Sequence, residues 1–258
     1  MSKYSNLNPY RHGLSLIYHR MKWDIKPEAW RSRKKLKELK NHHRSKKAVI
    51  LCNGPSLNKT DFSLLEDVYT FGLNKINLLF DRTSYRPSYI VSVNKLVIEQ
   101  NADFFNSTEI PLFLDSKGAQ FVDKKESITF LHSTGYRGFA NDCSISIDQG
   151  HTVTYVALQL AFHMGFSEVA LIGCDHNFAT KGPANKTVVS GESDPNHFDP
   201  NYFSGGQKWQ LPDLFESEIS YKMANDAYEA DNRQIFNATE GSELKIFPEK
   251  SLDDFLNH

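Results

Sequence analysis

The sequence predicts an α/β fold in which helices flank a doubly wound, mostly parallel sheet. Short apolar runs of strand length alternate with segments of helix length, as they do in strand–helix–strand units with right-handed crossovers. The first of these runs, residues 48–52, ends in Asn-Gly-Pro-Ser, which is typical of a buried parallel strand that enters a tight loop. Residues 150–178 contain a small-residue turn, an apolar helix and a strand in one unit. Together these observations predict a Rossmann-like core.

The length of 258 residues allows one such domain with appendages. The hydrophobic fraction of 40% and the charged fraction of 24% exclude a disordered or fibrous chain. The expected organisation, in chain order, is a basic N-terminal helical extension (1–47), a Rossmann-like nucleotide-binding core (48–178), a lid or acceptor loop (179–212), and a C-terminal helix–strand segment that completes the core (213–258).

Individual elements follow from apolar patterning and from the residues that end it. Strands are expected at 48–52, 68–72, 89–93, 111–114, 128–131 and 169–173, and helices at 95–105 and 152–164. The second helix has apolar residues at helical spacing, and Gly165 is well placed to end it in a left-handed conformation.

Residues 179–212 are rich in Gly, Pro, Asn, Asp and Ser, with four aromatic residues among them. A long segment with little regular pattern in a compact enzyme usually forms a lid or binding loop, and the aromatic residues favour a lid that becomes ordered. Beyond it we expect a helix at 213–231, short strands at 234–237 and 244–247, and a final helix capped by Ser251.

Charge is distributed unevenly along the chain. Residues 1–47 hold 14 Lys and Arg against 3 Asp and Glu, a net of +11, so the remainder carries −12 within the total of −1. Residues 31–47 could attract anionic lipid headgroups at about 1 kcal/mol per cation. The alternative is that this extension docks on the acidic body or on a neighbouring subunit of a homo-oligomer. Nucleic acid is disfavoured as a partner because the basic stretch has few interleaved aromatic residues.

No apolar run approaches the length of a membrane span, and the N-terminus lacks the apolar region of a signal peptide. We therefore expect a cytoplasmic protein, with its basic extension at the inner face of the membrane. The odd number of cysteines, Cys52, Cys143 and Cys174, indicates reduced core thiols. Neither Cys-x-x-Cys nor His-x-x-x-His occurs, so no metal site is predicted.

The loop after the first strand is the first candidate for a functional site, because ligands of open α/β sheets bind beyond the carboxyl ends of the strands. Gly54 permits close approach of a ligand, while the Asn53 amide and the Ser56 hydroxyl can bond a phosphate or ribose. The loop matches neither the P-loop motif nor the Gly-x-Gly-x-x-Gly fingerprint. Its alternative interpretation is a purely structural turn.

Two further asparagines follow predicted strands, Asn74 after 68–72 and Asn94 after 89–93. An amide at a strand end offers both a donor and an acceptor to a base or sugar without adding charge. Each could instead cap a helix. Three amides on successive strand ends make a shared polar site the stronger hypothesis.

Two segments carry a family resemblance: VILCNGPSLNKTDFSLL with the later Asn74, and DQGHTVTYVALQLAFHMGFSEVALIGCDHNF. They resemble the bacterial CMP-sialic-acid-dependent sialyltransferases that build lipooligosaccharide. They equally resemble a group that includes archaeal 6-hydroxymethylpterin diphosphokinase and flagellin-modifying nonulosonate transferases. The likeness covers roughly residues 48–178 and does not reach the basic extension.

The transferase resemblance implies a glycosyltransferase with a CMP-activated sugar donor, a glycan acceptor, inversion of configuration, no metal or other cofactor, and a lid histidine as general base. It places the substrate at Asn53, Gly54, Ser56, Asn74, Asn94, Gly150, His151, Thr152, Asp175, Asn177 and Tyr202. His197 becomes the candidate base, since imidazole suits the removal of a hydroxyl proton near neutral pH. The alternative is that His197 is a solvated loop histidine.

The sequence departs from the sialyltransferase pattern after Asp175. That family places tyrosines there to stabilise the departing phosphate, whereas His176, Asn177 and Phe178 follow here. Tyr202, His151 or Lys181 could take over this task.

Two other functions compete with sugar transfer. A diphosphokinase would use the same loop with ATP and Mg²⁺, and Asp175, Asp194 or Asp199 could supply metal carboxylates. A nucleotide-binding regulator or scaffold that has lost its catalytic groups is the third hypothesis, and the polar and aromatic lid makes it less attractive.

Overall fold

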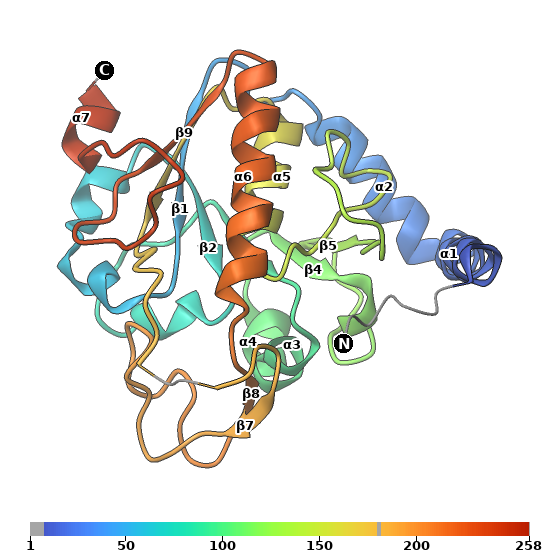
Figure 1. Cartoon of the computed structure of the whole chain (residues 1–258), viewed down its shortest axis with the longest axis horizontal. Helices are drawn as coiled ribbons and strands as arrows, with labels where there is room; N and C mark the ends of the chain where they lie inside the picture. Colours follow the sequence, from blue (N-terminus) through green and yellow to red (C-terminus); the bar gives the residue numbers. More distant parts are fainter. Residues whose placement is uncertain (1–7, 180–181, 258) are drawn as a thin grey trace.

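A seven-stranded sheet forms the centre of the computed structural model, which describes residues 8–179 and 182–257 (Figure 1). All its strands run parallel, in the order β5-β4-β3-β2-β1-β6-β9. Their bounds are β1 Lys47–Leu51, β2 Tyr69–Leu73, β3 Tyr89–Ser92, β4 Leu112–Asp115, β5 Ile128–Leu131, β6 Glu168–Ile172 and β9 Gln234–Asn237. The chain moves outward from β1 to β5 and then returns to β6 on the other side of β1. This reversal makes the sheet doubly wound and confirms the predicted fold class.

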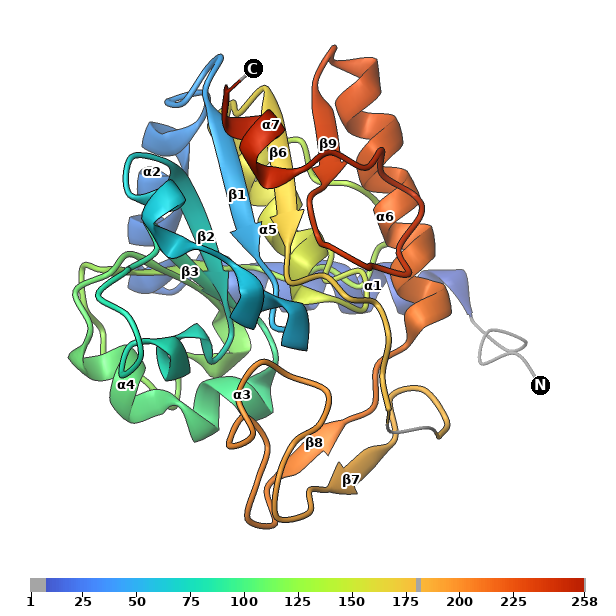
Figure 2. The same cartoon turned by 90° about the vertical axis from the view of Figure 1, so that its left-hand side faces the viewer.

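Helices cover both faces of the sheet and one of its edges (Figures 1 and 2). The α-helices are α1 Pro9–Asp24, α2 Pro27–Leu39, α3 Lys95–Gln100, α4 Ala102–Ser107, α5 Val153–Met164, α6 Leu214–Ala230 and α7 Leu252–Asn257. Short 3₁₀ helices are η1 Pro55–Lys59, η2 Phe62–Leu65, η3 Ile76–Leu79 and η4 Ser116–Gly118.

Alternate residues of each strand serve two separate apolar cores, one on each face of the sheet. In β1, Ala48 and Ile50 pack with α5 and α6, whereas Val49 and Leu51 pack with α3, α4 and α7. Buried on both faces, such strands read as continuous apolar runs in the sequence. This is why the strand positions were predictable.

Helix α5 confirms the predicted central unit. Every side chain from Thr154 to Met164 is buried, so the helix is enclosed by the rest of the protein on all sides. Thr152 caps it by accepting a hydrogen bond from the Thr154 amide at 3.3 Å, and Gly165 ends it with φ +96°. The helix thereby points its N-terminus at the carboxyl end of the sheet, where β1 and β6 end side by side.

Helix α2 covers the β5 edge of the sheet and bonds two backbone groups of that edge strand. The Ser32 hydroxyl accepts from the Phe130 amide at 2.9 Å, and Arg31 donates to the carbonyl of Ile128. Several cations of the basic stretch therefore bond the body: Lys35 donates to the Glu126 carbonyl and Lys40 lies 2.6 Å from Asp142. The basic stretch 31–47 thus contacts the body of the same chain, which was the alternative to lipid contact.

Two elements differ from their predictions. The single helix expected at 95–105 is split into α3 and α4 at Asn101, whose φ of −111° leaves the helical region and whose amide side chain donates to Asn77 at 2.9 Å. No strand forms at 244–247, where one was expected. Leu244 and Phe247 are buried, but the Leu244 carbonyl accepts a hydrogen bond from the Asn237 side chain at 3.0 Å. Apolar alternation there reflects burial without strand pairing.

The lid folds beneath the carboxyl ends of the strands (Figure 2). It contains a small antiparallel hairpin that the sequence did not predict, β7 Thr187–Val189 with β8 Lys208–Gln210. Helix α6 leads away from it, and its N-cap Asp213 accepts a hydrogen bond from the Glu216 amide. None of the helices in the described residues is long and apolar enough to cross a membrane. The three cysteines are free and buried.

Candidate functional site

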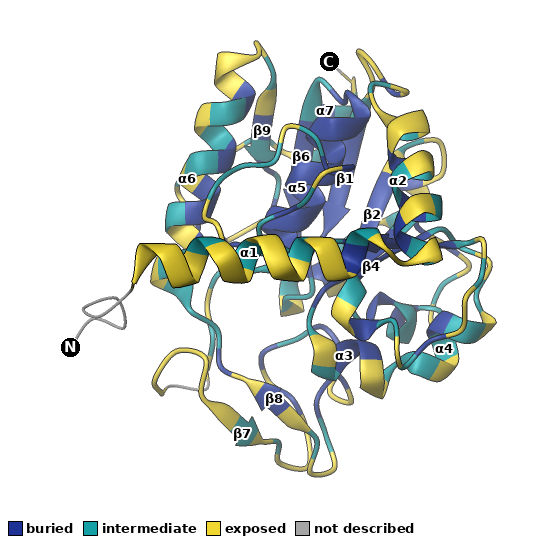
Figure 3. Cartoon of the chain, turned by 90° about the vertical axis from the view of Figure 1, so that its right-hand side faces the viewer, coloured by how far each residue is buried: buried dark blue, intermediate teal, exposed yellow. Residues whose placement is uncertain are grey.

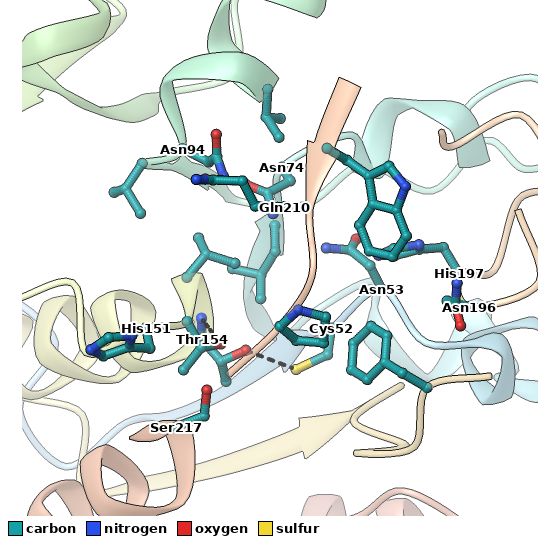
Figure 4. Close-up of a pocket in the computed structure, with 18 of the residues that line it drawn as sticks. Cys52, Asn53, Asn74, Asn94, His151, Thr154, Asn196, His197, Gln210 and Ser217 are labelled. Atoms are coloured by element: carbon teal, nitrogen blue, oxygen red, sulfur yellow. Dashed lines mark hydrogen bonds between the residues drawn. The ribbon is translucent and has the colours of Figure 1, made fainter. Parts of the chain in front are cut away.

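One cavity of about 830 Å³ lies between the carboxyl ends of β1, β2, β3 and β6 and the lid. This volume is typical of small-molecule sites, which run from roughly 300 to 1,000 Å³. Figure 4 shows labelled side chains of the strand ends, the lid hairpin and helix α5 around this common space. The predicted site residues that line it are Asn53, Gly54, Asn74, Asn94, Gly150, His151, Thr152, Asp175, Asn177, His197 and Tyr202. Lys181 lies outside the described residues.

The β1 loop is held tightly against the end of β6. The Gly54 amide donates to the Gly173 carbonyl at 2.8 Å, and a Cβ on Gly54 would overlap the Asp175 carboxylate. Only glycine fits this approach. The Oδ1 atom of Asn53 is buried without a hydrogen-bond partner in the described part of the chain, which is costly unless a ligand satisfies it.

Ser56 differs from its expected place. Its hydroxyl donates to Asp175 at 2.8 Å and its amide contacts both carboxylate oxygens at 3.3 Å. Ser56 is also absent from the described lining of the cavity. The Asp175 carboxylate, just beyond β6, therefore accepts from the Ser56 hydroxyl that was expected to bond a phosphate. Anions favour this place because it is the start of a helical turn.

The asparagines at the next two strand ends both reach the cavity while serving local structure. Asn74 has a left-handed φ of +49°, and its Oδ1 accepts from Ser92 at 3.1 Å. Asn94 caps α3 by accepting from the Leu96 amide at 2.9 Å, and its Nδ2 lies 3.3 Å from Gln210 Oε1 of the lid. Asn94 therefore both caps a helix and lines the polar cavity.

The turn before α5 gives the cavity its second wall. Gly150 and His151 both have positive φ, +54° and +62°, and a Cβ on Gly150 would overlap the Tyr155 ring. The His151 ring lies 3.8 Å from the Asp213 carboxylate. Because this turn opens α5, the positive end of the helix dipole faces the cavity.

The lid is fastened to the strand ends by several hydrogen bonds. The Phe198 amide donates to the Asn53 carbonyl at 2.9 Å, and Asn58 donates to the Phe198 carbonyl at 2.8 Å. Lys75, directly after Asn74, donates to the Tyr202 carbonyl at 2.8 Å and to Gln207 Oε1 at 2.7 Å. The lid is thereby tied to the same loops that carry the asparagines.

Lys75 is a buried cation, only 5% exposed. Burial lowers the pKa of its ammonium group from 10.5 to about 8, and the nearby Asp194 carboxylate opposes this shift. Its Nζ atom also lies 4.6 Å from the centre of the Phe203 ring, a favourable cation–π distance. Lys75 therefore anchors the lid from below.

His197 and Asp194 form a histidine–carboxylate pair with the geometry of a supported base, as His176 and Glu218 also do at 2.9 Å. The two residues lie three apart in the lid, and His197 Nδ1 is 2.7 Å from Asp194 Oδ2. The imidazole is stacked on the Tyr202 ring at 4.0 Å with an interplanar angle of 2°. A carboxylate at Nδ1 fixes the orientation and the tautomer of the ring. Nε2 is then the nitrogen that can accept a substrate proton.

Asp194 remains ionised despite its burial. Burial raises the pKa of its carboxyl group, but hydrogen bonds from His197 and from the amides of Asn196 and Phe203 outweigh this effect and lower the pKa below 3.8. From the sequence alone, Asp194 is predicted only as a metal ligand. Its position three residues before His197 was the signal that could have identified the pair.

Other lining residues were missed entirely. Three lysines, Lys95, Lys117 and Lys208, come from the β3, β4 and lid segments, and Trp209 and Gln210 from the hairpin. Lysines are frequent phosphate-binding residues, whereas the described part of the β1 loop contributes no cation to the lining. They could not be assigned from the sequence because lysine is abundant throughout the chain.

The carboxylates proposed for a metal do not gather. Asp175 accepts from Ser56, Asp194 from His197, and Asp199 lies 3.1 Å from Arg82. Among the described residues, no group of three or more His, Cys, Asp or Glu side chains could hold a metal ion. Asp175, Asp194 and Asp199 therefore do not form a ready-made metal cluster.

Fold and cavity together define a doubly wound α/β protein with a lidded polar site at its topological switch point. The chain belongs to the 6-hydroxymethylpterin diphosphokinase MptE-like family, whose model matches residues 27–181. No curated protein matches the chain. Among solved structures, it is similar in fold to the MAf glycosyltransferase from Magnetospirillum magneticum AMB-1, with a TM-score of 0.50 and 14% identity. That match covers 88% of this chain and 39% of the other.

Proposed function

We propose that this protein is an inverting glycosyltransferase that moves a sugar from a CMP-type nucleotide donor to a glycoconjugate or polysaccharide acceptor. The observation that carries the proposal is the His197–Asp194 pair at 2.7 Å, in a cavity that also holds Asn53, Asn74 and Asn94. A positioned imidazole and uncharged amides suit the activation of a hydroxyl beside a sugar. The fold shared with a glycosyltransferase is consistent with this function.

In the proposed reaction, Nε2 of His197 removes the proton of the acceptor hydroxyl as its oxygen attacks the anomeric carbon. The new carbon–oxygen bond forms on the face opposite the bond to the nucleotide phosphate, so configuration inverts. The phosphate leaves with the electron pair of the broken bond. Asp194 stabilises the imidazolium that results.

The departing phosphate needs positive charge. The dipole of α5 and the lysines Lys95, Lys117 and Lys208 supply it in this proposal. His151 at the start of α5 is the better placed of the two described substitutes for the family's tyrosines. Tyr202 lies flat against His197, and burial raises the pKa of its hydroxyl, so it positions the base and keeps its own proton.

Diphosphokinase activity is the competing function, and the family description favours it. It requires a metal held near the phosphates, and the separation of Asp175, Asp194 and Asp199 between different partners argues against it. We therefore rank sugar transfer first.

The proposal is tested by chromatographic measurement of CMP released from CMP-sialic acid, with and without EDTA. We expect release that EDTA does not abolish. His197→Ala should lower turnover by about 10² to 10⁴, Asp194→Asn should lower it less, and the exposed His42→Ala should have no effect.

Two results would contradict the proposal. A His197→Ala variant with the wild-type rate removes this residue from the mechanism. Transfer of diphosphate from ATP that requires Mg²⁺, without any cleavage of the CMP donor, replaces sugar transfer with the diphosphokinase function.

A further inference from the structure

Helix α1 carries a row of large apolar side chains that face away from the body. Of the thirteen exposed large hydrophobic residues in the described chain, seven lie between Tyr10 and Trp30. The concentration is therefore local. The six that form the row are 57% to 82% exposed and are Tyr10, Leu14, Ile17, Tyr18, Met21 and Ile25.

The spacing of this row places it on one side of the helix. Successive members are separated by three or four residues, apart from the adjacent Ile17 and Tyr18, so they gather on one continuous stripe. We call these six residues the α1 stripe. A stripe of this kind normally packs against a core or a partner.

A different side of α1 attaches the helix to the body. Trp23 is buried and its ring stacks on His132 with centroids 6.5 Å apart, while Arg20 donates to the carbonyl of Ile145. The α1 stripe is therefore left on the outside while the helix stays fixed. Figure 3 shows α1 as a largely exposed rod on the surface.

The charges beside the α1 stripe are positive. Arg11 and Lys22 occupy the adjoining side of the helix, Lys26 follows just beyond its end, and all three are exposed. The only acidic residue of α1, Asp24, is paired with Arg20 at 2.9 Å and with Arg33. Two copies of α1 facing each other would bring like charges together, which disfavours self-pairing.

We propose that α1 binds the surface of a bilayer that contains anionic lipids. The α1 stripe enters the boundary between headgroups and acyl chains, and Arg11, Lys22 and Lys26 contact the phosphates. This surface lies upstream of the 31–47 stretch, much of which contacts the body. The inference does not depend on the catalytic proposal.

Vesicle flotation of the full chain tests it, with phosphatidylcholine vesicles that do or do not contain 30% phosphatidylglycerol. We expect the wild-type protein to float with the anionic vesicles and at least tenfold less with the neutral ones, and to be released by high salt in part. The triple variant Leu14→Gln, Ile17→Gln, Met21→Gln should lose flotation, since it removes apolar surface while keeping good helix formers.

Control variants separate a specific loss from general damage. Leu64→Gln with Phe215→Gln removes exposed apolar side chains elsewhere and should float like the wild type. Arg11→Gln, Lys22→Gln, Lys26→Gln should weaken anionic binding while leaving any neutral binding unchanged. All variants should keep the wild-type circular dichroism spectrum.

Failure of the wild type to float with anionic vesicles, or flotation of the α1 stripe variant at the wild-type level, overturns the proposal. Light scattering after size exclusion adds a further outcome. A wild-type dimer that the triple variant converts to a monomer, with no flotation, would show that the α1 stripe contacts a second copy and would equally overturn the proposal.

Discussion

His197 illustrates how single residues in this site depend on neighbours that the sequence does not display. Its pairing with Asp194 and its stacking on Tyr202 arise because the lid folds back on itself between residues 194 and 202. The asparagines were predictable, since each directly follows an apolar strand. Ser56 was not, because its partner Asp175 lies 119 residues away in the sequence.

Gly54 gives a prediction at the residue scale. Gly54→Ala should lower the free energy of unfolding by about 1 to 3 kcal/mol, because the new methyl group meets the Asp175 carboxylate and the Gly173 carbonyl 2.7 Å away. Chemical denaturation measures the change.

The matched control is Gly13→Ala in α1, where nothing lies within 4 Å of the added Cβ. Alanine should stabilise that helix by about 0.5 to 1 kcal/mol. If Gly54→Ala were as harmless as Gly13→Ala, the close approach of the β1 loop to β6 would be wrong.

The elements predicted best from the sequence are those whose pattern of apolar residues matches their burial in the structure. The parallel strands and α5 were located within about a residue, since both are buried on all sides and rich in apolar residues. The break between α3 and α4 depends on Asn101 meeting Asn77 across the structure. The hairpin of β7 and β8 is short and polar, so no periodicity marks it.

The α1 stripe could have been read from its three- and four-residue spacing. The prediction of membrane contact at residues 31–47 rests on their strong positive charge. Charge density alone did not distinguish cations that bond the body, such as Arg31 and Lys40, from those left on the surface.

Lid attachment through Lys75 should depend on pH. Its folded pKa of about 8 lies below the ordinary 10.5, so between these values the unfolded chain holds a proton that the folded chain has released. The Lys75 contribution to the free energy of unfolding therefore rises with pH across this window, by up to about 3 kcal/mol.

Comparison of wild type with Lys75→Met isolates this effect from other titrating groups. The difference in unfolding free energy between the two proteins, from urea denaturation at pH 7, 8, 9 and 10, should shift in favour of the wild type as pH rises. A pH-independent difference would mean that Lys75 is not buried as a cation beneath the lid.

For the whole molecule, the doubly wound topology follows from the strand–helix alternation, and the switch point between β1 and β6 then locates the cavity. Residues 1–47 carry a net charge of +11 and the remainder carries −12. These opposite charges fit the structure, since part of the basic extension packs against the acidic body. What the sequence could not provide was the set of distances that turns separate polar residues into one site.

The central claim is that the strand-end amides and the lid form a metal-independent nucleotide site. Thermal unfolding with CMP, CDP, ATP and GTP, each with and without EDTA, tests it most directly. A ligand at 100 times its Kd adds about 2.7 kcal/mol of stability, so CMP should raise the melting temperature equally in EDTA. Stabilisation by ATP with Mg²⁺ alone, or by none of the four nucleotides, would contradict the account.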